Sequence, residues 1–415
     1  MPDQRQEPPR YRVLSGFLWV TGGRLAAALL QSLALILVAR GTDPEKFGVF
    51  SAFLGLVVVL QTSVDLGVST YALRARAADP SDPDIRRCLN VYRWLGAVLL
   101  SALLVAGMLL ATFGEIPWWW LIPLAVGLTV ERQADMRLNM AIADGDTWKN
   151  SSVLVARRMV ALGIVVVAAE ALGPITAYGL GSLLAALLSW LLGTQLVSVT
   201  TPSSERPPND TRYILRRSRP FWANSFMAQV RNLDTLVVGF VASSVQTGYY
   251  GAISRSVSPL RMIGTSLAGV MMPAAVKSGR GDKRGKRRVL MVLLLGLGLA
   301  YTALGVTAHS WVVWLLGSDY QGAVAGFRFL LVALALDGVS SVITAVMQGS
   351  GLERVVAWSA TASSLLGLGA VALGGWLEGA TGAAAGLALS YVVQFVIMLV
   401  GGGHLFFGPQ RGRHL

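Results

Sequence analysis

Apolar blocks of about 20 residues, separated by short polar loops, run through almost the whole chain. A block of this length, coiled as a helix, crosses the hydrocarbon core of a bilayer, which is about 30 Å thick. Only 14% of the residues are charged, whereas a soluble domain carries about 25%. We therefore predict an all-α polytopic membrane protein with about twelve transmembrane helices. The predicted spans are 13–39, 47–72, 89–112, 117–138, 152–171, 176–199, 220–241, 248–274, 289–309, 324–347, 355–376 and 380–403.

Positive charge is concentrated in alternate loops. With the N-terminus inside, the cytoplasmic segments hold 23 Lys and Arg residues, and the outside loops hold only Arg40 and Lys46. Positive residues favour the cytoplasmic side, so the pattern predicts a multi-pass protein of the bacterial cytoplasmic membrane with both termini in the cytoplasm. The net charge of +13 follows from this asymmetry, and no nucleic acid is expected as a partner. The cytoplasmic segments are 1–12, 73–88, 139–151, 200–219, 275–288, 348–354 and 404–415.

A basic, proline-containing segment divides the spans six and six. The predicted parts are a cytoplasmic tail (1–12), an N-lobe (13–199, spans 1–6), a cytoplasmic linker (200–219), a C-lobe (220–403, spans 7–12) and a second tail (404–415). Shifting the sequence by 200 residues places four residues on similar ones, namely Val38 on Val238, Gly48 on Gly248, Phe50 on Tyr250 and Ala52 on Ala252. Six spans return the chain to the same side, so we predict two parallel lobes around a central cavity.

The sequence lacks the nucleotide-binding and metal-binding motifs that are typical of enzymes. The segment 279–287 has the wrong glycine spacing for a phosphate-binding loop and lacks its Ser or Thr. The three histidines, His309, His404 and His414, lie at helix ends or in the tail and cannot form a metal cluster, so no metal site and no cofactor are expected. Cys88 is the only cysteine, and an inert thiol is expected there. The chain is predicted not to be an enzyme, with a membrane enzyme active between helices as a less favoured alternative.

Ionisable residues inside the apolar blocks are the candidate functional groups. Each costs about 2.5–3.5 kcal/mol at the centre of a span, so it needs water, a partner or a ligand. The first span contains Arg24, which has no acid within one turn. The candidate cavity residues are Arg24, Arg231, Arg255 and Arg261, and the candidate ion-coupling acids are Asp65, Asp234 and Asp337.

Other intramembrane charges have simpler interpretations. Arg231 and Asp234 are three residues apart and could form a structural ion pair. Glu131, Arg132 and Asp135 lie near the inner end of the fourth span and could reach water. Arg328, early in the tenth span, could anchor its helix at the interface.

Arginine is well suited to bind one class of anion. Its planar guanidinium binds phosphate through two hydrogen bonds and stays charged at any cellular pH. A cavity with Arg24 on one lobe and Arg231 or Arg255 on the other would hold a phosphate or diphosphate, and rocking of the lobes would expose it to either side.

Two segments resemble the bacterial polysaccharide (O-antigen type) flippases of the multidrug/oligosaccharidyl-lipid/polysaccharide (MOP) exporter superfamily. In the first, residues 34–74, an Ala-Arg pair is followed by Pro-Glu, then by an aromatic residue and glycine, and then by Asp-Leu-Gly. The matching residues are Ala39, Arg40, Pro44, Glu45, Phe47, Gly48, Val49, Phe50, Ser51, Asp65, Leu66 and Gly67. The second comprises residues 315–320 and 346–351. Gly41-Thr42-Asp43 departs from the Leu-Gly that the family commonly has before the proline.

The resemblance implies a MATE-like fold and the export of a polyprenyl-diphosphate-linked oligosaccharide from the inner to the outer leaflet. Related lipid-II-type flippases use a first-helix arginine in a cationic cavity, which singles out Arg24. The implied partners are membrane lipids, the lipid-linked glycan and polysaccharide polymerase or assembly proteins, and a monomer is the default. Coupling to H⁺ or Na⁺ is left open.

Two transporter classes are the alternatives. Residues 282–287 resemble the cytoplasmic signature of major-facilitator transporters of small solutes, but Ser278 stands where that signature has glycine. The other alternative is a MATE-type drug exporter of the same superfamily. Either exporter would leave the surface glycan of the cell unchanged.

Overall fold

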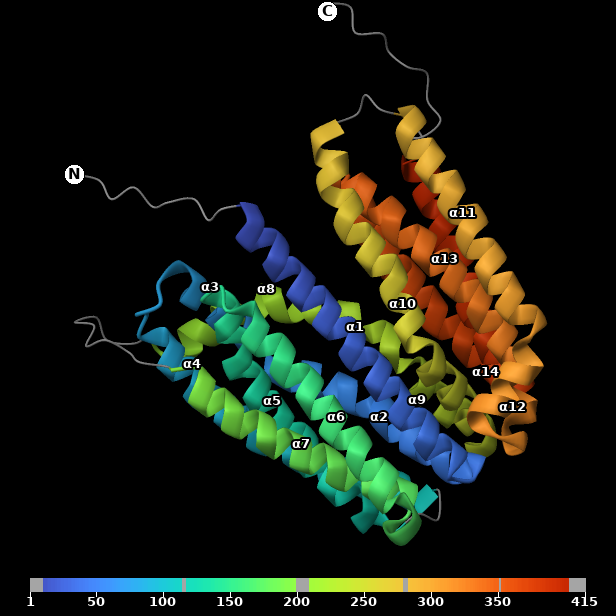
Figure 1. Ribbon diagram of the computed structural model, residues 1–415, viewed down its shortest axis with the longest axis horizontal. Helices are drawn as coiled ribbons and strands as arrows, with labels where there is room; N and C mark the ends of the chain where they lie inside the picture. The colour runs from blue at the N-terminus through green and yellow to red at the C-terminus, as the bar shows by residue number, and fades with distance from the viewer. Residues whose placement is uncertain (1–9, 114–116, 199–208, 279–282, 351, 403–415) are drawn as a thin grey trace, which may run out of the picture. The chain divides into compact units, whose positions relative to one another are not determined.

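The computed structural model describes residues 10–113, 117–198, 209–278, 283–350 and 352–402, and all regular secondary structure within them is helical (Figure 1). The prediction of an all-α protein is therefore confirmed. The elements are α1 (Arg10–Arg40), α2 (Pro44–Asp65), α3 (Val68–Ala78), α4 (Asp84–Phe113), the 3₁₀ turn η1 (Trp118–Leu121), α5 (Ile122–Ala143), α6 (Thr147–Leu172), α7 (Pro174–Leu196), α8 (Thr211–Val230), η2 (Arg231–Leu233), α9 (Asp234–Val241), α10 (Ser244–Ser278), α11 (Lys283–Val306), α12 (Ala308–Leu316), η3 (Ser318–Ala323), α13 (Val324–Gly349) and α14 (Glu353–Gly402).

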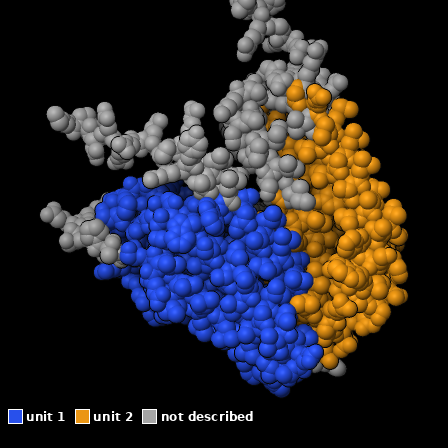
Figure 2. Space-filling view, in the orientation of Figure 1, with its two compact units in different colours: residues 1–34, 57–109, 117–228 blue, residues 35–56, 110–116, 229–415 orange. Residues whose placement is uncertain are grey.

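Two compact units make up the chain (Figure 2). Unit 1 consists of Met1–Ala34, Val57–Leu109 and Pro117–Ala228, and unit 2 consists of Leu35–Leu56, Leu110–Ile116 and Gln229–Leu415. The division falls inside α1 and α2, so the hairpin Leu35–Leu56 packs within unit 2. The predicted lobe limits stay a prediction, because much of the linker lies outside the described residues.

Seven helices in the described part of the chain are long and apolar enough to cross a membrane, and an eighth span results if the pair α11 and α12, bent by 67°, is counted as one. The total of twelve spans stays a prediction. One of the seven helices, α14, has 50 residues and would measure about 75 Å if straight, far more than one crossing needs. It breaks at Glu378 and Gly379, where Gly379 has a φ of 60°.

The break in α14 is stabilised from within unit 2. The backbone N–H of Ala380 donates to Oε1 of Gln246 on α10 at 2.9 Å. Ala380 is fully buried, and a buried backbone N–H without a partner costs about 1–3 kcal/mol, so Gln246 replaces the bond that the break removes. The two arms on either side coincide with the predicted eleventh and twelfth spans.

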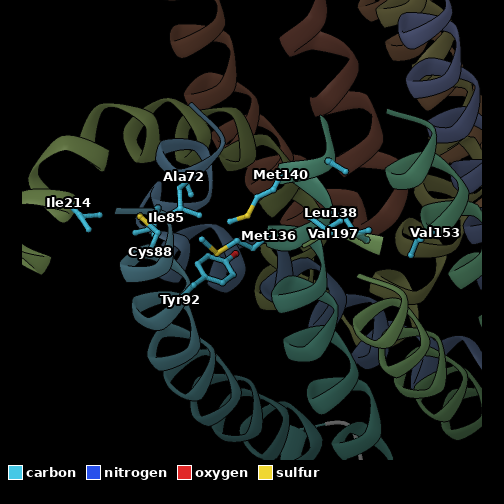
Figure 3. Close-up of a cluster of buried hydrophobic side chains, with 12 residues drawn as sticks. Ala72, Ile85, Cys88, Tyr92, Met136, Leu138, Met140, Val153, Val197 and Ile214 are labelled. Atoms are coloured by element: carbon cyan, nitrogen blue, oxygen red, sulfur yellow. The ribbon is translucent and has the colours of Figure 1, made fainter. Parts of the chain in front are cut away.

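Unit 1 has a core of buried apolar side chains (Figure 3). Ala72 on α3, Ile85 and Cys88 on α4, and Met136 and Met140 on α5 contribute to it. Cys88 is a free thiol with none of its surface exposed. This burial agrees with the inert role expected for it, since cysteine reactivity requires access.

Unit 2 contains a close crossing of α2 and α10 at two glycines. A Cβ added to Gly48 would lie 2.0 Å from the carbonyl oxygen of Ser244, and one added to Gly248 would lie 1.8 Å from that of Pro44. Neither position can hold a side chain, because both backbones already touch. Gly48 and Gly248 are equivalent in the internal repeat, so the two copies of the repeat meet each other at their matching glycines.

The residues matched by the repeat are also buried. Val38, Phe50, Val238 and Tyr250 each expose 0% of their surface, and Ala52 and Ala252 expose only a few per cent. The similarity between the two halves of the sequence thus has a packing cause at the start of α2 and of α10. Small residues at such contacts let transmembrane helices approach closely.

We predict that Gly48→Ala destabilises the protein strongly. The new methyl group would force α2 and α10 apart, and overpacking of this kind typically costs about 1–3 kcal/mol. The measurement is the thermal unfolding midpoint of the detergent-purified variant, and Gly248→Ala should give the same loss.

The matched control is Gly296→Ala on α11 of the same unit, where an added Cβ meets nothing within 4 Å. This substitution should leave the midpoint unchanged or raise it, because alanine is the better helix former by about 1 kcal/mol. Equal midpoints for Gly48→Ala and Gly296→Ala would contradict the close crossing.

Candidate functional site

Arg24 lies near the midpoint of α1. Its neighbour Gly23 packs against α6, where an added Cβ would lie 2.7 Å from the Cβ of Ser151. Arg24 itself is exposed, and no hydrogen bond or ion pair joins it to another described residue. Exposing a guanidinium on an apolar helix to lipid costs free energy, whereas contact with water or with an anion stabilises its charge. Arg24 is therefore available to a ligand.

Arg231 stands at the 3₁₀ turn η2 (Arg231–Leu233), which separates α8 from α9. Its side chain lies outside the described residues, so its predicted ion pair with Asp234 stays a prediction. The carboxylate of Asp234 accepts hydrogen bonds from the Thr235 backbone N–H at 2.7 Å and from the Tyr250 hydroxyl at 2.8 Å.

Arg261 on α10 is the centre of a charged cluster in unit 2. Asp234 on α9 and Asp337 on α13 lie within electrostatic range of its guanidinium, as do Tyr250 and Tyr391. The Nε of Arg261 is buried and has no hydrogen-bond partner among the described residues. The structure thus brings together three residues that the sequence singled out separately, one cation and two acids.

A second glycine contact positions this cluster. A Cβ added to Gly264 on α10 would lie 2.6 Å from the Cα of Gly338 on α13. Gly338 directly follows Asp337, and Gly264 is three residues beyond Arg261, so the close approach of the two helices carries the acid toward the guanidinium. Arg255, six residues before Arg261 on α10, is half-buried.

Asp65, the third candidate acid, belongs to unit 1 and has a structural environment. It ends α2 at a sharp break, where Leu66 and Gly67 have φ values of 50° and 74°. Its carboxylate accepts hydrogen bonds from the Gly67 N–H at 3.1 Å, the Ser69 hydroxyl at 3.0 Å and the Tyr92 hydroxyl at 2.8 Å. These donors hold the left-handed turn, so Asp65 stabilises the break between α2 and α3.

Unit 1 also contains an ion network that sequence reasoning missed. Arg157 on α6 contacts Glu131 at 3.2 Å and pairs with Asp135, both on α5, and Arg158 contacts Glu131 at 3.0 Å. Glu131 and Arg157 expose only 8% and 5% of their surface. Glu131 is therefore paired and buried instead of reaching water. The sequence signal that could have indicated this network is the pair of consecutive arginines, Arg157 and Arg158, inside the predicted span 152–171.

The network is balanced in charge. Arg157 and Arg158 offset Glu131 and Asp135, and Arg132 lies within electrostatic range of Asp65 and Asp135. Buried charges need compensation of this kind, because removing one partner leaves an unpaired charge that costs several kcal/mol. Arg24 has no such compensation among the described residues, and this difference sets it apart from Arg157 and Arg158.

Arg328, on α13 of unit 2, fits the anchoring interpretation. It is exposed, and its Nε donates to the carbonyl oxygen of Gly305 near the end of α11 at 3.1 Å. This bond occupies part of the guanidinium with a backbone group.

Comparisons with solved structures identify the fold. The inward-facing conformation of a multidrug resistance MATE family transporter of the MOP superfamily matches with a TM-score of 0.71 and 16% identity, over 91% of this chain and 94% of that chain. The lipid II flippase MurJ, in an inward closed conformation, matches with a TM-score of 0.70 and 14% identity, over 92% of this chain and 87% of that chain. The outward-facing conformation of a multidrug resistance MATE family transporter matches with a TM-score of 0.65 and 15% identity, over 96% of each chain.

Sequence comparison identifies the family. A search of curated proteins finds no match. A family model described as "Polysaccharide biosynthesis protein" matches residues 37–325, which is more than half of the chain. The resemblance to MOP exporters inferred from residues 34–74 is confirmed by both results. The chain thus belongs to the polysaccharide biosynthesis protein family, with the fold of the MOP exporter superfamily.

Proposed function

We propose that this protein is a flippase that moves a polyprenyl-diphosphate-linked oligosaccharide from the inner to the outer leaflet of the bacterial cytoplasmic membrane by alternating access. The cargo would be one repeat unit of a cell-surface polysaccharide. The protein would act as a transporter and not as an enzyme, with both termini in the cytoplasm.

The observation that carries the proposal is Arg24, an exposed and uncompensated guanidinium on a helix apolar enough to cross the membrane. Such a group repels cationic cargo and attracts anions. A diphosphate offers the planar oxygen pairs that arginine binds through two hydrogen bonds. The family description supports polysaccharide biosynthesis as the setting, and the fold is shared with a lipid II flippase.

Arg261 is the second cation that we propose to act on the diphosphate. In the absence of cargo, Asp234 and Asp337 offset its charge. An anion that binds Arg261 would compete with these carboxylates and free them to bind H⁺ or Na⁺. Binding of the anion and of the cation would then be linked, since each changes the other's affinity by the same factor.

Membrane potential would favour export of this cargo. An anionic headgroup that leaves the negative interior gains about 2.3 kcal/mol per charge per 100 mV. Transport is therefore expected to continue when only the ion gradient is removed.

A MATE-type drug exporter is the second candidate, because MATE transporters are among the structural neighbours. The major-facilitator alternative has no support, since the fold is that of the MOP superfamily. Drug export predicts a change in drug resistance without a change in surface glycan, and the flippase predicts the reverse.

Deletion of the gene should cause lipid-linked oligosaccharide to accumulate on the cytoplasmic leaflet and surface polysaccharide to disappear. The measurement is mass spectrometry of polyprenyl-diphosphate-linked sugars together with analysis of surface glycan. Normal lipid-linked pools and an intact glycan, in a strain without a second exporter, would contradict the proposed cargo.

Arg24→Ala should abolish glycan export, while Arg24→Lys should retain part of it, because lysine keeps the charge and loses the two-pronged geometry. Complementation of the deletion strain measures export, and membrane-fraction blotting checks expression. The matched control is Arg212→Ala, which removes an exposed arginine on α8 within the predicted cytoplasmic linker, and should export normally. Normal export by Arg24→Ala would remove this residue from the site.

Asp234→Asn and Asp337→Asn should each change the dependence of transport on ΔpH or on Na⁺, because each removes a carboxylate that faces Arg261. Asp65→Asn should instead lower the thermal unfolding midpoint and keep the ion dependence, since Asp65 accepts three structural hydrogen bonds in unit 1. The measurement is the rate of cargo flipping by the protein reconstituted in lipid vesicles, with ΔpH and the Na⁺ gradient varied separately. If ion dependence is the same in all three variants and the wild type, coupling does not pass through the Arg261 cluster.

A further inference from the structure

A pocket of about 640 Å³ lies within unit 1, between α4, α5 and α7. It contains neither Arg24 nor any member of the Arg157 network, so it is separate from the groups assigned to cargo. Its lining includes Arg86 and Arg93 of α4, Arg137 of α5 and Trp190 of α7. Arg86, Arg93 and Trp190 are exposed, so the pocket opens to the surface of the unit.

The lining of the pocket, as far as the described residues form it, is cationic. Three arginines contribute to it, and no acidic residue does. Arg93 donates to the side-chain oxygen of Asn90, which also lines the pocket and holds the guanidinium in place. In contrast to the Arg157 network, the positive charge here is left for a ligand.

Polarity changes along the length of the pocket. On α4, Arg86, Asn90 and Arg93 are followed on the same face by Ala97 and Leu100. On the antiparallel α5, Arg137 and Gln133 stand at the same end as Arg86, with Thr129 deeper in the span. From Arg86 to Leu100 the helix rises about 21 Å. A charged end and an apolar end at this spacing match a phospholipid, with its headgroup phosphate at the membrane surface and its acyl chain in the core.

The surroundings of the pocket are those of a lipid-facing surface. Trp94 and Val98 directly follow the pocket residues Arg93 and Ala97 on α4, and they expose 78% and 57% of their surface. Leu187 and Leu191 on α7 are exposed around Trp190. Exposed apolar side chains on membrane-spanning helices face lipid, and tryptophan favours the level of the headgroups. The charged end of α4 is the end that the positive-inside rule assigns to the cytoplasm.

We infer that this pocket binds an anionic phospholipid of the cytoplasmic leaflet, with the lipid phosphate on Arg86, Arg93 and Arg137 and an acyl chain along Ala97 and Leu100. A bound lipid would offset part of the positive charge of the three arginines and join α4, α5 and α7 at their inner ends. The inference does not depend on the identity of the transported cargo.

The test is lipid binding to the purified, delipidated full-length protein, measured by native mass spectrometry with phosphatidylglycerol or phosphatidylethanolamine. Wild-type protein should retain phosphatidylglycerol in preference to phosphatidylethanolamine. The double variant Arg93→Gln/Arg137→Gln should bind phosphatidylglycerol about 30-fold more weakly, which corresponds to about 1 kcal/mol for each arginine near a membrane surface. The matched control Arg212→Gln/Arg216→Gln removes two exposed arginines of α8 outside the pocket and should bind as the wild type does.

A second variant separates a pocket from a merely basic surface. Ala97→Trp fills the apolar half and leaves the three arginines in place, so it should also weaken retention of phosphatidylglycerol. Unchanged retention in Ala97→Trp, equal loss in the two arginine double variants, or equal binding of both lipids would each overturn the inference. Displacement of the lipid by inorganic phosphate at millimolar concentration would show that the pocket binds free phosphate instead.

Discussion

Every charge placed inside an apolar helix must find a partner, and this constraint organises the charged interior of the protein. Glu131, Asp135, Arg157 and Arg158 satisfy one another across α5 and α6. Asp65 and Asp234 are satisfied by hydroxyl and backbone donors. The same constraint makes exceptions informative, because a cation left exposed on such a helix implies an anion or water that the protein itself does not supply.

Close helix contacts are what allow these partners to meet. The crossings at Gly48 with Gly248 and at Gly264 with Gly338 bring backbones together where no side chain fits. The second crossing lies beside Asp337 and within one turn of Arg261, so helix packing and charge compensation share one location. In a membrane, packing of small residues replaces the hydrophobic effect as the force that joins helices. A substitution at Gly264 or Gly338 is therefore expected to disturb both stability and the charged cluster.

Much of the helical pattern could be predicted from the sequence, because block length and hydropathy depend on local composition. The breaks could be predicted less well. The turn at Leu66 and Gly67 interrupts a continuous apolar block, and it depends on Asp65 accepting a bond from Tyr92, 27 residues away. The sequence comparison matched Gly48 to Gly248, but only the structure shows that the two glycines touch. Arg157 and Arg158 were overlooked because their acids lie on another helix, which no local pattern reveals.

The distribution of arginine charge also bears on the choice between cargo classes. Among the described arginines, Arg157 and Arg158 are neutralised inside unit 1, Arg261 is shared with two acids, and Arg24 is uncompensated near the middle of α1. A carrier of cationic compounds would gain nothing from an exposed guanidinium near the middle of α1, which costs about 2.5–3.5 kcal/mol on insertion. A carrier of diphosphates recovers that cost through two-pronged hydrogen bonds each time cargo binds. The charge pattern therefore favours anionic cargo over cationic drugs within the MOP fold.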